Sequence, residues 1–158
     1  MSISCSVLVK EGSNINATDL YSVLEKICSY EKLVIEMNTK EIDKTDRIKV
    51  IRTNISDLPF DRDSSRQLCV DIFDEPYKFK YNSFEWFDKS ISFFETMVID
   101  YFDGNEDLLF RVARGLLKQY SKAKLWVEED WFYTIYDLDK ISNKQFDNEW
   151  CYKNPKIF

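Results

Sequence analysis

The chain has 158 residues, of which 44% are hydrophobic and 16% aromatic, enough apolar material to fill the core of one domain. Only three glycines and three prolines are present, so neither long flexible linkers nor intrinsic disorder is expected. The formal net charge of −6 argues against direct binding to nucleic acid or anionic lipid, because both attract basic proteins. A basic protein partner is the natural complement, although the same charge also serves simply to keep a domain soluble.

The first half of the chain predicts one helix among five strands. Alternating or β-branched apolar residues predict strands over residues 2–9, 32–37, 47–55, 67–73 and 77–81. Asn16 is the expected N-cap of a helix over about 17–30, which carries apolar residues at intervals of three and four. Polar turns are expected at 39–46 and 74–76, and a loop at 58–66.

Two helices are predicted next. Ser83 is the expected N-cap of a helix over 83–102, whose apolar stripe is the widest in the chain. We therefore expect it to be the main core helix, with Phe87 and Phe94 buried. A second helix is expected to begin at Glu106. Glycine inside a helix lowers its stability by roughly 1 kcal/mol relative to alanine. Gly115 within this second helix therefore indicates close contact with another helix.

The last regular pattern is a hairpin. Residues 122–128 and 131–136 alternate in polarity and are joined by Glu129 and Asp130. The order of elements predicts an α+β fold, a single domain over 1–158 with a mainly antiparallel sheet backed by helices on one face. No regular pattern of apolar residues assigns a secondary structure to the tail from about 140 to 158.

Cysteine usage and hydropathy indicate a cytoplasmic protein. The cysteines do not form a CxxC pair, and no signal peptide is recognisable in residues 1–10. No apolar run approaches the eighteen residues of a membrane span. We therefore expect reduced thiols, no membrane association and no zinc at Cys5, Cys28, Cys69 and Cys151.

The composition also argues against an enzyme. There is no histidine, which removes the commonest general base, the commonest metal ligand and every Ser-His or Cys-His arrangement. Its three glycines, Gly12, Gly104 and Gly115, do not form the phosphate-binding patterns of nucleotide enzymes. Paired carboxylates could serve a glycosidase, but no pair stands out among so many acids. We expect no catalytic, cofactor-binding or metal-binding residues, and no cofactor.

The most unusual stretch combines acids and aromatic rings between Trp126 and Trp150. Rings supply buried area at protein interfaces, and carboxylates meet Lys or Arg of a partner. The candidate partner-binding residues are Glu128, Glu129, Asp130, Trp131, Tyr133, Asp137 and Asp139. The alternative is that Trp126 and Trp131 are simply core or sheet residues.

A second acidic stretch could join the same surface if its strand neighbours the hairpin, or it could be a solvated loop. It consists of Asp57, Asp61, Asp63, Asp71, Asp74 and Glu75.

The segment Lys124-Leu-Trp-Val-Glu128-Glu-Asp-Trp-Phe-Tyr133, after two predicted helices and an N-terminal strand and helix, carries a resemblance. In architecture and acidic composition the chain resembles small bacterial immunity proteins of contact-dependent growth inhibition and related polymorphic toxin systems. Such proteins protect a toxin-producing cell by binding its own toxin domain. The resemblance implies a protein-binding function and supplies no catalytic residues.

The sequence thus predicts a cytoplasmic immunity protein that binds and neutralises a cognate toxin domain, plausibly a basic nuclease. Two alternatives stay open. One is an acidic phage or mobile-element protein that mimics nucleic acid, which regularly spaced exposed carboxylates would favour. The other is a small-ligand binding domain, which a closed apolar pocket between sheet and helices would favour.

Overall fold

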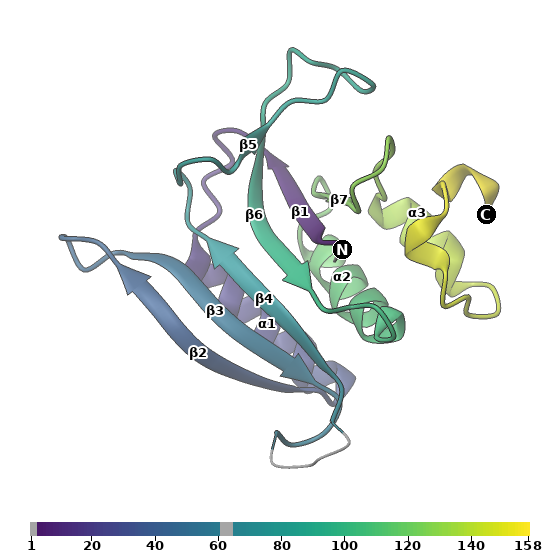
Figure 1. Cartoon of the computed structure of the whole chain (residues 1–158), viewed down its shortest axis with the longest axis horizontal. Coiled ribbons are helices and arrows are strands. Elements are labelled where there is room, and N and C mark those ends of the chain that lie inside the picture. The colour runs from purple at the N-terminus through teal and green to yellow at the C-terminus, as the bar shows by residue number, and fades with distance from the viewer. Residues whose placement is uncertain (1–2, 61–64) are drawn as a thin grey trace.

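The computed structural model describes residues 3–60 and 65–158, and all of their strands belong to one antiparallel sheet (Figure 1). The strands are β1 (Cys5–Lys10), β2 (Val34–Ile42), β3 (Ile48–Ser56), β4 (Gln67–Phe73), β5 (Tyr81–Asn82), β6 (Phe93–Asp100) and β7 (Lys124–Trp126). The helices are α1 (Ala17–Glu31), α2 (Glu106–Gln119), α3 (Ile135–Ser142) and the short 3-10 helices η1 (Trp150–Tyr152) and η2 (Pro155–Ile157). The strand order is β2-β3-β4-β6-β1-β7, with β5 pairing β6.

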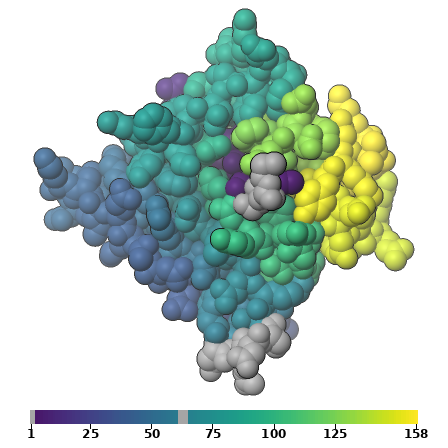
Figure 2. All heavy atoms as spheres, in the orientation of Figure 1, coloured from purple at the N-terminus to yellow at the C-terminus, as the bar shows by residue number. Residues whose placement is uncertain are grey.

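The predicted α+β class is confirmed. Helices α1 and α2 lie behind the sheet in Figure 1, and the main hydrophobic core lies between them and the sheet. The opposite face of the sheet is turned toward the viewer in Figures 1 and 2. Asn16 caps α1 as predicted, because its side chain accepts the backbone N–H of Asp19 at 2.8 Å.

Two acids of the second acidic stretch hold the start of α1 and are not available to a partner. Asp74 is 1% exposed and accepts the backbone N–H of Ala17 at 3.1 Å. Glu75 accepts the backbone N–H groups of Gly12 at 3.0 Å and Asn14 at 3.2 Å. These carboxylates satisfy backbone donors that burial would otherwise leave unpaired.

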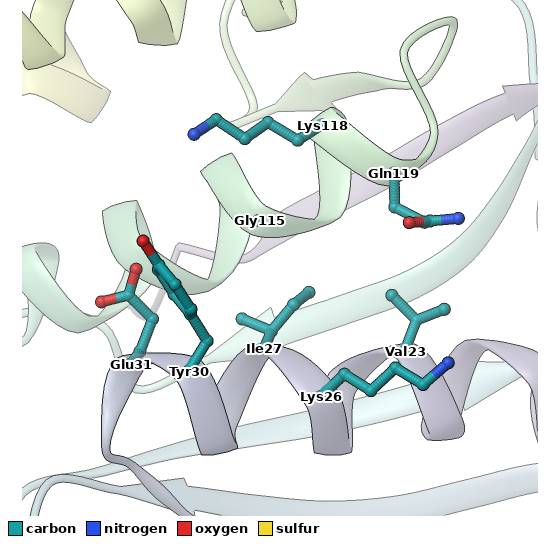
Figure 3. Close-up of a pocket in the computed structure, with 8 residues that line it drawn as sticks. All are labelled: Val23, Lys26, Ile27, Tyr30, Glu31, Gly115, Lys118 and Gln119. Atoms are coloured by element: carbon teal, nitrogen blue, oxygen red, sulfur yellow. The ribbon is translucent and has the colours of Figure 1, made fainter.

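The close helix contact predicted from Gly115 is confirmed (Figure 3). A Cβ atom at Gly115 would lie 2.9 Å from Cγ2 of Ile27 on α1, closer than atoms of two side chains approach. The glycine therefore allows α1 and α2 to pack closely.

The predicted helix over 83–102 is wrong. Residues 93–100 form β6, at the middle of the sheet between β4 and β1, and residues 83–92 form a loop with no helix. Phe94 and Met97 face the core under the helices, whereas Phe93 packs in a second apolar cluster. A strand buried on both faces is apolar at consecutive positions, so its sequence resembles a broad helical stripe.

The predicted hairpin is also wrong in its second half. β7 is only three residues long, pairs with β1 and meets the following segment at a single bridge between Leu125 and Tyr133. The chain then enters α3 through a capping box, in which Thr134 and Asp137 each bond the other's backbone N–H. This local signal overrides the alternation of residues 131–136. The predicted strand over 77–81 is wrong except at Tyr81, which begins β5.

The C-terminal tail is an integral part of the fold. Trp150 is fully buried and its indole N–H donates to the carbonyl oxygen of Glu106 at 2.9 Å. The Tyr133 hydroxyl donates to the carbonyl oxygen of Trp150 at 3.1 Å. The tail thereby covers the N-terminal end of α2.

Candidate functional site

Three predicted site residues form an exposed acidic turn immediately after β7. Glu128, Glu129 and Asp130 are all exposed, and no ion pair involves any of them within residues 3–60 and 65–158. Glu128 adopts a left-handed backbone conformation with φ of 59°. The indole N–H of Trp126 donates to the carbonyl oxygen of Glu129 at 2.9 Å. The turn is therefore held in one shape while its carboxylates face solvent.

The other predicted site residues lie elsewhere or serve the fold. Tyr133 is 0% exposed, so its side chain cannot meet a partner, and its hydroxyl accepts the indole N–H of Trp131 at 3.1 Å. Asp137 belongs to the cap of α3, and Asp139 pairs with Arg114 on α2 at 3.1 Å. The structure thus brings together the acids of 128–130, with the half-buried Trp131 beside them.

The acidic turn adjoins a second apolar cluster, which we call the aromatic cluster. It consists of Phe84, Trp86, Phe87, Phe93, Trp126 and Phe132. Ring centroids of Phe84 and Trp126 are 4.9 Å apart, and those of Phe87 and Phe132 are 5.2 Å apart. The loop over 83–92 and the segment after β7 therefore pack on each other, and Figure 2 shows them meeting at the surface.

Sequence reasoning missed the loop over 83–92 because it placed these residues in a helix. Phe87 is 46% exposed, and the acids Glu85 and Asp88 on either side of it are exposed as well. Asp88 accepts the backbone N–H of Ser90 at 3.0 Å and its hydroxyl at 2.6 Å, and these bonds lower the pKa of Asp88. The pattern Asp88-x-Ser90 is typical of a turn and was the signal for a loop.

The second acidic stretch does not join the acidic turn, because β6 and β1 separate β4 from β7. Asp57 pairs with Arg66 at 3.0 Å, and Asp61 and Asp63 lie outside the described residues. Asp71 lies on the sheet face away from the helices. Burial raises the pKa of the Asp71 carboxyl, with Arg52 opposing this effect and Asp100 adding to it.

The cysteines are mostly buried. All four are free thiols, and three of them, Cys5, Cys28 and Cys151, are buried. Burial raises the pKa of Cys28 and of Cys151 to about 12. A thiol with so high a pKa stays protonated at neutral pH and is a poor nucleophile.

The groove between α1 and α2 has a volume of about 220 Å³ and is open to solvent (Figure 3). Val23 and Ile27 form its floor, and Lys26, Tyr30 and Lys118 lie at its edges. Glu31, which also lines the groove, pairs with Arg111 at 3.0 Å.

Comparisons and searches add no further site. No family model, curated protein or solved structure matches this chain. In the part of the chain that the structure describes, no three His, Cys, Asp or Glu side chains gather so as to hold a metal ion. None of the described helices combines the length and apolar character needed to cross a bilayer.

Proposed function

We propose that this chain is a cytoplasmic immunity protein that binds a basic toxin domain and neutralises it. The observation that carries this proposal is the acidic turn, which exposes three carboxylates and whose backbone is tied to Trp126 by the hydrogen bond at Glu129. The acidic composition and the segment 124–133, which resemble immunity proteins, support the same function, although β6 stands where the first of the two predicted helices was expected.

The mechanism is electrostatic and steric. Carboxylates that project from a fixed turn attract the Lys and Arg side chains of a partner and speed its encounter with the chain. Holding the turn before binding reduces the entropy lost when the complex forms. If the toxin is a nuclease, the acids occupy the basic surface that it uses for nucleic acid and so block its substrate.

The test is to co-express this chain with the product of the gene immediately upstream of its own and to measure growth and complex formation. Reversal of Glu128, Glu129 and Asp130 to Lys should abolish both protection and the complex. The matched control reverses Glu25, Glu36 and Glu41, three exposed acids on α1 and β2, and should still protect. Both variants change the net charge equally, so only the location of the charge differs.

Two results would count against the proposal. Full protection by the triple Lys variant would remove the acidic turn from the interface. Failure of the wild-type chain to bind any product of a neighbouring gene would contradict the immunity function itself.

A further inference from the structure

We propose that the loop over 83–92 forms the second half of the binding surface, and that the partner presents an apolar side chain, ringed by basic residues, which docks on Phe87. This inference rests on the proposed function and specifies the chemistry of the partner. The surface then has an aromatic centre with acids on two sides.

Phe87 is the most exposed ring of the aromatic cluster, since Trp86 and Trp126 are only partly exposed. One side of its ring packs against Phe132, at 5.2 Å between centroids, and against Phe93, at 5.9 Å. The side chain is nevertheless 46% exposed, whereas Phe84 is 6% and Phe93 1% exposed. A ring that is held from one side and exposed on the other offers contact area with little loss of rotamer freedom on binding.

The loop that carries Phe87 is ordered by its own hydrogen bonds. The backbone N–H of Phe87 donates to the carbonyl oxygen of Phe84 at 3.2 Å, and that of Ile91 donates to Asp88 at 3.1 Å. Together with the Asp88–Ser90 bonds, these contacts fix the position of the ring before a partner arrives. Such preorganisation lowers the cost of association.

The charges on the two segments favour a basic partner, although Lys10 also lies near Asp88. Loop 83–92 and segment 124–132 together carry five carboxylates, on Glu85, Asp88, Glu128, Glu129 and Asp130, against the two lysines Lys89 and Lys124. Lys124 Nζ lies 5.4 Å from the centroid of the Phe87 ring, so one of the two lysines is already engaged by the cluster. A second copy of this chain would bring like charges together, which disfavours self-association through this surface.

The experiment titrates the isotope-labelled chain with two synthetic peptides that have the same number of lysines. One peptide alternates lysine with leucine, and the other is oligolysine. The Lys–Leu peptide should shift the amide signals of both 83–92 and 127–131, and oligolysine should shift mainly those of 128–130. Phe87→Ser should lower the affinity for the Lys–Leu peptide about fivefold or more, as loss of an interface anchor does.

The controls separate binding from folding. Tyr30→Ser removes an aromatic side chain that is 86% exposed on α1 and should leave the affinity unchanged. If Phe87→Ser does not fold, Glu85→Lys tests the same loop through an exposed residue and should also lower the affinity for the Lys–Leu peptide. Equal affinity of wild type and both loop variants, or shifts confined to other elements, would overturn the inference.

The same variants separate this inference from the proposed function. If the triple Lys variant no longer binds the toxin while Phe87→Ser and Glu85→Lys still bind it, the proposed function stands and the two-part surface is wrong. If the peptide maps to both segments while no toxin binds, the surface stands and the immunity function is wrong.

Discussion

The indole N–H of Trp126 donates to the carbonyl oxygen of Glu129 at 2.9 Å, while its ring lies 4.9 Å from that of Phe84. One side chain thus joins the acidic turn to the aromatic cluster. Since Trp126 belongs to β7, the strand that ends the sheet beside β1, the turn is attached to the sheet itself. The backbone of the turn keeps its position because it is tied to a packed element.

Trp126→Phe should loosen the acidic turn while keeping an aromatic ring in the cluster. Loss of one hydrogen bond should lower the free energy of unfolding by about 0.5–1.5 kcal/mol, and the complex with a basic partner should weaken. The control is Trp86→Phe, because the indole N–H of Trp86 has no hydrogen-bond partner among residues 3–60 and 65–158. Denaturant melts and a binding titration of both variants check this prediction. Because Trp86 lies in the proposed binding loop, it controls for stability only, and equal binding by Trp126→Phe and the wild type would show that the hydrogen bond does not order the turn.

Phe94 and Phe87 should differ sharply in their contribution to stability. Phe94 is fully buried in β6, so Phe94→Ala should cost about 3–5 kcal/mol. Phe87 is 46% exposed, so Phe87→Ala should cost about 1 kcal/mol or less. Urea unfolding of the two variants is the measurement. Similar losses of unfolding free energy would indicate that both side chains are buried, as the predicted helix over 83–102 required, and would contradict the structure.

The sequence predicted much of the fold because its local signals were sufficient. Asn16 marked the start of α1, and the alternating segments gave β3 and β4 almost to the residue. The failure at 83–102 has a tertiary cause. Phe93 and Phe94 are both buried in a strand that is covered on its two faces. The second face is covered by Phe84 and by Phe132, and Phe132 is distant in sequence.

The candidate site was predicted only in part for the same reason. Glu128, Glu129 and Asp130 could be recognised because they are consecutive and polar. Tyr133 is buried by contacts with Trp150 in the tail, and no periodic pattern in the sequence predicts these contacts. The role of Phe87 could not be found without the contact of two loops that lie about forty residues apart.

Asp71 should make stability depend on pH. Because burial raises its pKa in the folded state, the folded chain binds this proton more tightly than the unfolded chain does. Stability from this group is therefore present below the unfolded pKa and falls as pH rises through the folded pKa. Asp71→Asn should raise the free energy of unfolding at pH 7 and give no gain at pH 3, measured by urea melts. The same change at the exposed Asp130 is the control, and an equal gain there would contradict this assignment.

The most direct test of the central claim is the association rate constant of this chain with the basic toxin domain proposed as its partner, measured by stopped flow at low and high salt. Reversal of Glu128, Glu129 and Asp130 to Lys should slow association at least about tenfold at low salt. Added salt should reduce the difference between the rate constants of this variant and of the wild type. The Glu25, Glu36 and Glu41 reversal should associate at nearly the wild-type rate. Equal rate constants for the two triple variants would show that the acidic turn is not the surface that meets the partner.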